Sequence, residues 1–198
     1  MSPMAPALKS REIIAMGAST GGVDAIQRVL TKFPADSPAI LIVQHMPPQF
    51  THRFAQRLNT LCQITVREAV DGDAIDRGLA LLAPGDFHMT LHPGGAHYTV
   101  RTNKNPLVHH QRPAVDVLFE SVARHAGARA MGILLTGMGM DGARGMAAMK
   151  AAGAFTIAQD EASSVVYGMP REAVNAGGVD LILDINSIGQ AALAHLHH

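Results

Sequence analysis

A serine with the surroundings of a nucleophile lies in the segment Gly17-Ala18-Ser19-Thr20-Gly21, directly after the apolar run at 13–16. The segment matches the pattern G-x-S-x-G, in which glycines on both sides of a serine allow a sharp turn from a strand into a helix. Such a turn exposes the serine hydroxyl at the start of the helix. The pattern therefore indicates serine-based acyl chemistry, with Ser19 as the candidate nucleophile.

Two other interpretations of this loop stay open at the level of the pattern. Ser19 or Thr20 can cap the following helix by accepting hydrogen bonds from its first N–H groups. A glycine-rich turn at a helix start can also bind phosphate through backbone N–H groups. The phosphate interpretation is weakened because the glycines do not follow G-x-G-x-x-G and the next predicted strand ends near His45 rather than at an acidic residue.

His45 is the candidate base for this serine. A hydroxyl is a weak nucleophile until a neighbouring group removes its proton, and an imidazole, with an unperturbed pKa of about 6.5, does so near neutral pH. His45 follows the apolar run at 39–43, which reads as the second strand of the chain. Because consecutive parallel strands commonly lie side by side, we expect its ring within reach of Ser19.

A carboxylate that orients the imidazole would complete a catalytic group. Asp86, Asp141 and Asp160 each follow a predicted strand within a few residues, and spacing alone does not choose among them. Asp141 has the most informative context, since it follows a strand and a glycine-rich loop whose N–H groups are suited to binding an oxyanion. Its alternative role is to cap the helix that follows.

The elements that must position these residues are read from apolar periodicity. Strands are predicted at 13–16, 39–43, 79–83, 133–135, 155–158 and 181–183, a hairpin at 87–91 and 98–102, and helices after 22, at 48–59, from 113, and at 143–151, 171–175 and 187–196. In the helix at 48–59, Phe50, Phe54 and Leu58 form the expected buried stripe. This alternation predicts an α/β fold with a doubly wound, mostly parallel sheet between two helical layers and one antiparallel hairpin.

Composition favours one domain with a well-buried core. The chain has 198 residues, 47% of them hydrophobic, and its 16 basic residues balance 16 acidic ones, which argues against attraction to nucleic acid or an anionic membrane. The single cysteine, Cys62, suits a reducing compartment such as the cytoplasm. No apolar run reaches the roughly 18 to 20 residues that span a bilayer, so we expect no membrane insertion. Residues 1–10 read as a leader or linker remnant, and 11–198 as the catalytic domain.

Seven ordered sequence blocks resemble the catalytic domain of the chemotaxis protein-glutamate methylesterases, and together they cover nearly the whole chain. The blocks are IAMGASTGG at 14–22, QHMPP at 44–48, APGD at 83–86 with HM at 88–89, RP at 112–113 with VDVLF at 115–119, LTGMG at 135–139 with DG at 141–142, AQ at 158–159 with EAS at 161–163, and GMPR at 168–171. Seven blocks in one order are far more specific than any single motif.

The resemblance implies roles for individual residues. Ser19 would be the nucleophile, His45 the general acid and base, and Asp141 the orienting carboxylate, which makes the choice among the three aspartates. The residues implied in the vicinity of the oxyanion and substrate are Thr20, Gly21, Met138 and Gly139. The reaction implied is hydrolysis of glutamate γ-methyl esters on methyl-accepting chemotaxis receptors with release of methanol, together with deamidation of certain receptor glutamines. Neither step calls for a metal or cofactor.

The implied partners are the cytoplasmic helices of those receptors. Arg53 and Arg57, one helical turn apart, can meet an acidic receptor flank or simply form a solvated face. Many members of the family carry a receiver domain before the catalytic domain, and none precedes Arg11 in this sequence. We therefore expect either an excised catalytic domain or a receiver-free member. A histidine group at 88, 92 and 109–110 gives an alternative transition-metal site, although its spacing matches no known pattern.

Overall fold

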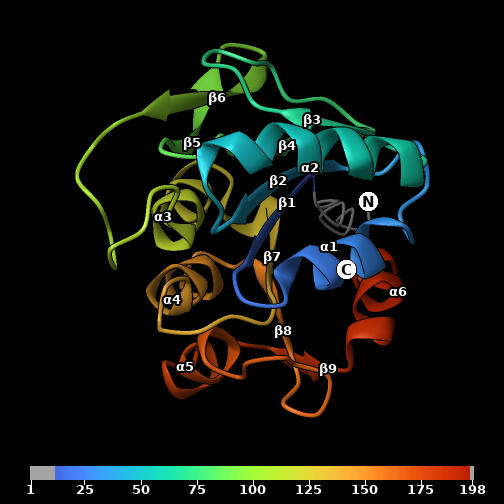
Figure 1. Cartoon of the computed structure of the whole chain (residues 1–198), viewed down its shortest axis with the longest axis vertical. Coiled ribbons are helices and arrows are strands. Elements are labelled where there is room, and N and C mark those ends of the chain that lie inside the picture. The colour runs from blue at the N-terminus through green and yellow to red at the C-terminus, as the bar shows by residue number, and fades with distance from the viewer. Residues whose placement is uncertain (1–11, 197–198) are drawn as a thin grey trace, which may run out of the picture.

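The computed structural model describes residues 12–196, and within them a seven-stranded parallel sheet forms the centre of the molecule (Figure 1). The strand order is β3-β4-β2-β1-β7-β8-β9. The strands are β1 (Ile13–Ala18), β2 (Ala39–Gln44), β3 (Thr65–Glu68), β4 (Leu79–Leu82), β7 (Ala130–Leu134), β8 (Phe155–Gln159) and β9 (Leu181–Leu183). The leader expected at 1–10 lies outside the described residues.

The central strands are apolar on both faces because helices cover both. Every residue of β1, β2 and β7 is buried. Continuous apolar runs of this kind are what parallel sheets require, and they explain why these strands were predictable from sequence. The edge strand β3 was missed, since its exposed and half-buried positions, with charged Arg67 and Glu68, leave no apolar run to detect.

Two helical layers enclose the sheet, which confirms the predicted doubly wound α/β fold. One face packs against α1 (Gly22–Leu30), α2 (Pro48–Leu61) and α6 (Ile185–Ala194). The other face packs against α3 (Val115–His125), α4 (Ala143–Ala151) and α5 (Met169–Asn175), with the short 3-10 turn η1 (Gly127–Arg129) leading into β7. In Figure 1 α1 and α6 lie on one side of the sheet, and α3, α4 and α5 lie on the other.

The predicted hairpin is also confirmed. Strands β5 (His88–Gly94) and β6 (His97–Asn103) pair antiparallel and form a separate two-stranded sheet. Met89, Leu91 and Val100 join the apolar cluster beneath α3, and the Leu91 N–H donates to the Ser121 hydroxyl of that helix at 2.9 Å. The hairpin therefore extends the core on the α3 side of the main sheet.

Two details of the predicted helices are wrong. Phe50 is not part of the buried stripe of α2, because it lies in the first helical turn, past the end of β2, and remains 54% exposed. Phe54 and Leu58 are buried as expected. The helix predicted from Pro113 begins at Val115, because Ala114 is in an extended conformation and serves as the N-cap. None of the helices within 12–196 combines the length and apolar character needed to cross a membrane.

The two phenylalanines of α2 give a matched test of this packing. Phe54→Ala removes a side chain that is only 6% exposed and should lower the free energy of unfolding by about 3–5 kcal/mol. Phe50→Ala, in the same helix, should change it by less than about 0.5 kcal/mol. Denaturant unfolding of both variants checks the difference, and equal destabilisation would contradict the placement of α2.

Candidate active site

Ser19 is the first residue after β1, and its backbone is fixed on both sides. Its N–H donates to the Thr136 carbonyl at 3.0 Å, and its own carbonyl accepts from the Gly22 N–H at 2.8 Å and from Gln44 Nε2 at 2.9 Å. These bonds tie the serine to the loop after β7 and to the last residue of β2, the two strands that flank β1. The serine is therefore held at the carboxyl edge of the sheet, where the sequence placed it.

The helix-cap interpretation of this loop is wrong. The N-cap of α1 is Gly21, and no side chain caps the helix. Gly21 adopts a left-handed conformation with φ of 80°, and a Cβ there would approach Val165 to 2.6 Å. Glycine is thus required for the turn, and the Ser19 and Thr20 hydroxyls are left free of a capping role.

Strand register brings His45 beside Ser19. The parallel pairing of β1 with β2 sets Ala18 opposite Gln44, so that the next residues, Ser19 and His45, leave neighbouring strand ends together. The His45 N–H also donates to the Ala18 carbonyl at 3.2 Å. The predicted proximity of the two residues follows from this register.

Asp141 meets His45 from the loop after β7, which pairs with the other edge of β1. His45 Nε2 lies 2.7 Å from Asp141 Oδ2, and the two side chains are only 6% and 2% exposed. The three residues thus come from the carboxyl ends of three adjacent strands, β2, β1 and β7. In a doubly wound fold this is the edge where ligand and active sites gather.

The hydrogen bond to Asp141 determines which imidazole nitrogen is free. When Nε2–H donates to a carboxylate, the neutral ring keeps its lone pair on Nδ1. Nδ1 of His45 is buried and has no hydrogen-bond partner among residues 12–196. In this tautomer Nδ1 is the ring nitrogen that can accept a hydrogen bond.

Asp141 is itself held by the start of α3. Its Oδ2 accepts from the Val115 N–H at 2.7 Å and its Oδ1 from the Asp116 N–H at 2.8 Å. The alternative role of Asp141, as a cap of the helix that follows it, is wrong, since the N-cap of α4 is Gly142. Asp141 instead caps the neighbouring helix, where free N–H groups and the helix dipole stabilise a negative charge.

The two competing aspartates lie in other hydrogen-bond networks. Asp86 pairs with Arg112 and Lys104, and hydrogen bonds from these two cations lower the pKa of its carboxyl group. Asp160 accepts from the N–H and hydroxyl of Ser163 at 3.0 and 2.6 Å. Of the three candidates, only Asp141 contacts His45.

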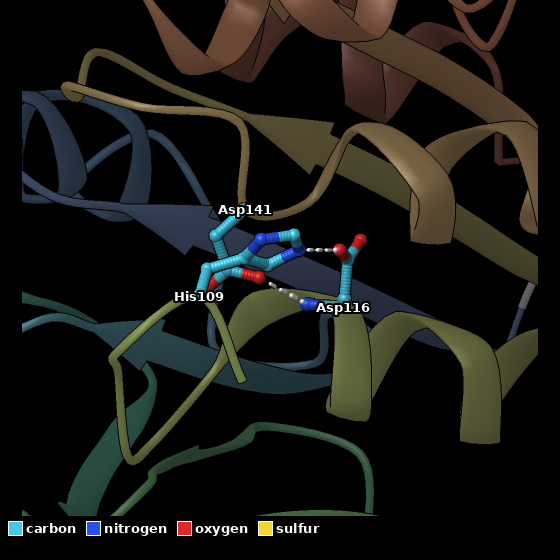
Figure 2. Close-up of side chains that lie close together, drawn as sticks. All are labelled: His109, Asp116 and Asp141. Atoms are coloured by element: carbon cyan, nitrogen blue, oxygen red, sulfur yellow. Dashed lines mark hydrogen bonds and ion pairs between the residues drawn. The ribbon is translucent and has the colours of Figure 1, made fainter. Parts of the chain in front are cut away.

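A second aspartate at the site, Asp116, was not singled out from the sequence. Its Oδ1 accepts from the N–H groups of Gly142 and Gly145 at 3.0 and 2.7 Å, and its Oδ2 accepts from His109 Nε2 at 2.8 Å. Figure 2 shows His109, Asp116 and Asp141 converging, with dashed bonds from His109 to Asp116 and from the Asp116 N–H to Asp141. Asp116 thus caps α4 while Asp141 caps α3.

Burial and charge act together on Asp116. Its side chain is fully buried, and burial, with a smaller contribution from the charge of Asp141, raises the pKa of its carboxyl group. The Gly145 N–H and the His109 ring act in the opposite direction. The sequence signal was weak, because Asp116 lies inside a helical pattern and meets Asp141 only in three dimensions.

The His109, Asp116 and Asp141 donor atoms lie within 4.8 Å of one another, a spacing that a metal ion requires. The group nevertheless does not fit a metal, because each carboxylate oxygen already accepts hydrogen bonds from helix N–H groups or imidazoles. His88, from the alternative histidine group, has both ring nitrogens bonded to backbone, at Pro106 and Ala114. His109, Asp116 and Asp141 therefore form a hydrogen-bond network rather than a metal site.

The loop after β7 packs directly on the serine. A Cβ on Gly137 would lie 2.8 Å from the Ser19 Cβ, so this approach requires glycine. Thr136 Oγ1 donates to the Thr20 carbonyl at 2.9 Å and joins the two loops. Within the described part of the chain, the N–H groups of residues 20–21 and 138–141 donate to no protein acceptor, and they include those of Thr20, Gly21, Met138 and Gly139. The predicted oxyanion vicinity therefore has free donors.

Two cavities open beside this loop. One, of about 540 Å³, is lined by residues of the 138–140 loop together with Glu161, Tyr167 and Arg171. The other, of about 420 Å³, includes Ser19 and extends along α1 to Arg57. Ser19 therefore borders the second of these cavities.

The chain is similar to known proteins over most of its length. The family model described as CheB methylesterase matches residues 14–192. A protein-glutamate methylesterase/protein-glutamine glutaminase of Salmonella typhimurium is 56% identical over 191 residues, 96% of this chain and 55% of that protein. A second protein of that name from Syntrophus aciditrophicus is 59% identical over 179 residues, 90% of this chain and 52% of that protein. The chain thus spans about half the length of these relatives.

A solved structure shows the same fold. The crystal structure of the Thermotoga maritima CheB methylesterase catalytic domain superposes with a TM-score of 0.90 at 35% identity, covering 93% of this chain and 98% of that one. Sequence and structure together show that this chain belongs to the CheB methylesterase family.

Proposed function

We propose that this chain is a serine esterase that hydrolyses glutamate γ-methyl esters on methyl-accepting chemotaxis receptors. The observation that carries the proposal is the buried bond between His45 Nε2 and Asp141 Oδ2, which leaves Nδ1, at the strand end next to Ser19, without a partner among the described residues. Family membership and the names of the similar proteins support the choice of substrate. Residues 12–196 act in this proposal as one catalytic domain.

In the first half of the reaction Ser19 Oγ attacks the ester carbonyl while His45 Nδ1 takes the hydroxyl proton. The resulting imidazolium keeps its Nε2–H bond to Asp141, which stays ionised between the N–H groups of α3. The carbonyl oxygen becomes an oxyanion, and the free N–H groups at Thr20 and Met138 are the proposed donors to it. Collapse of this intermediate transfers the proton from Nδ1 to the departing methoxy group, which leaves as methanol.

In the second half water hydrolyses the acyl-enzyme. His45 Nδ1 takes a proton from the water, the hydroxide adds to the acyl carbonyl, and the serine oxygen leaves with the same proton. The receptor glutamate is released as a free carboxylate and Ser19 is regenerated. Deamidation of a receptor glutamine follows the same steps with ammonia in place of methanol, and we include it in the proposal.

The surface around Ser19 supports a helical protein substrate. Large apolar side chains are exposed near the loops of the site, among them Met138, Met140 and Val165, and Met138 is 73% exposed. Exposed apolar groups of this size mark interaction surfaces. We propose that the cytoplasmic helices of the receptors bind here, and that a receiver domain, where one is attached, covers the same surface. Catalysis would then take place in the cytoplasm.

Replacement of the nucleophile tests the reaction class. Ser19→Ala should reduce methanol release from methylated receptors by at least about 10³-fold, because the hydroxyl that forms the acyl-enzyme is lost. Release of labelled methanol from receptor-containing membranes measures it, and unchanged thermal unfolding confirms the fold. Ser187→Ala, on the exposed side of α6, is the matched control and should retain full activity. Substantial release by the Ser19 variant would leave only a non-catalytic binding role for the loop.

Replacement of the carboxylate tests the choice of Asp141. Asp141→Asn should lower kcat by about 10³–10⁴-fold, because an amide no longer fixes the histidine tautomer or stabilises the imidazolium. It should also lower the free energy of unfolding by about 1–3 kcal/mol, since the N–H groups of α3 lose a charged acceptor. Asp160→Asn is the control from a rejected candidate and should leave kcat within about twofold of the parent chain. Similar losses in the two variants would reject the assignment.

A further inference from the structure

The network behind Asp141 has a symmetry that the proposed reaction does not use. Asp141 accepts two backbone N–H groups at the start of α3, and Asp116 accepts two at the start of α4. Each of the two carboxylates also accepts one imidazole N–H. For Asp141 the imidazole is His45, and for Asp116 it is His109. Only the first of these imidazoles is adjacent to the serine.

Asp116 and Asp141 are two buried carboxylates that lie close together, and their negative charges repel each other. Asp116 is fully buried, and the Asp141 charge acts to raise its pKa. By the same interaction, an unbalanced charge on Asp116 would act on Asp141 and on the imidazolium that forms at His45 during the reaction. The group that balances Asp116 therefore influences the base.

His109 is placed to provide that balance. Its side chain is 28% exposed, and its Nε2 bonds to Asp116 Oδ2 at 2.8 Å. The residue sits in a left-handed conformation with φ of 51°, which turns the loop so that the ring meets the start of α3. An N–H donor at this position offsets part of the second negative charge without contacting the substrate.

We propose that His109 is a positioning residue of the esterase, which balances the charge of Asp116 and thereby sets the pH range in which His45 acts as base. The inference rests on the proposed function for its kinetic readout. It concerns a residue outside the Ser19, His45 and Asp141 group, and it assigns the Asp116–His109 pair a role in tuning that group.

The other charged and titratable groups around the pair do not replace His109. From α4, Arg144 acts on Asp116 through space but is paired with Glu120 of α3. From β5, His88 has both ring nitrogens bonded to backbone. The remaining groups are Asp141 and, through it, His45 at the end of β2.

The test compares His109→Ala with His110→Ala. His110 also has a left-handed conformation, with φ of 60°, but it is exposed and has no partner among the described residues, so both substitutions carry the same backbone cost. In His109→Ala the unbalanced Asp116 charge stabilises the His45 imidazolium. The acidic limb of the pH profile of kcat/KM should therefore move to higher pH, by on the order of half a pH unit for a charge several ångströms away. His110→Ala should retain the parent profile.

Two further variants separate charge balance from loop structure. His109→Gln keeps a neutral N–H donor, so the acidic limb of its pH profile should lie between those of the parent chain and His109→Ala. In an Asp116→Asn background His109→Ala should have no further effect on the limb, because the charge to be balanced is gone. Unfolding midpoints of all variants establish that each is folded at the assay temperature.

A ¹⁵N NMR titration of the His45 ring in the Ser19→Ala chain gives the same shift without turnover. This measurement separates failure of the inference from failure of the proposed function, since it needs no substrate. An upward shift in His109→Ala that disappears in the Asp116→Asn background supports the proposal. An unchanged titration in His109→Ala, or an equal shift in both backgrounds, overturns it.

Discussion

The exchange of caps between α3 and α4 is the interaction on which the rest of the site depends. Asp141, which precedes α4, binds the first N–H groups of α3, and Asp116, within α3, binds those of α4. Hydrogen bonds to charged groups contribute about 1.5–3 kcal/mol each, so the two helix starts are firmly joined. The loop between β7 and α4 is held against α3 as a result, and this places the Asp141 carboxylate under His45.

The sheet supplies the other half of the geometry. In the parallel register, Ser19 and His45 directly follow paired residues at the ends of β1 and β2. The loop that carries Asp141 follows β7, which pairs with the other edge of β1. Gly21 and Gly137 allow the loops to turn and to touch where any side chain would clash. The acid therefore depends on helix capping, while the serine and the base depend on strand pairing.

This division explains what could be predicted from sequence. Ser19 and His45 were found because each ends an apolar run that is buried on both faces, and strand ends of a parallel sheet meet at one edge. Asp141 could be chosen over Asp86 and Asp160 only by resemblance to a family, since all three follow predicted strands. Its hydrogen-bond partners, in a helix about 25 residues earlier in the chain, left no local pattern.

Other differences from the sequence-based expectations have the same origin. Phe50 continues the apolar spacing of α2, but it lies in the first turn of that helix, past the end of β2, and remains exposed. Asp116 reads as an ordinary polar residue in a helix, and His109 as one histidine among many, until the fold brings them together. Periodicity identifies elements, whereas a network across three elements becomes visible only in the assembled structure.

The central claim is that Asp141 and His45 make Ser19 a nucleophile, and covalent trapping tests it most directly. An organophosphonate reacts with an activated serine and leaves an adduct that peptide mass spectrometry can locate. The structure predicts one stoichiometric adduct on Ser19 in the folded chain and none after heat unfolding. An unlabelled Ser19, or labelling spread over other serines at comparable rates, would contradict the account.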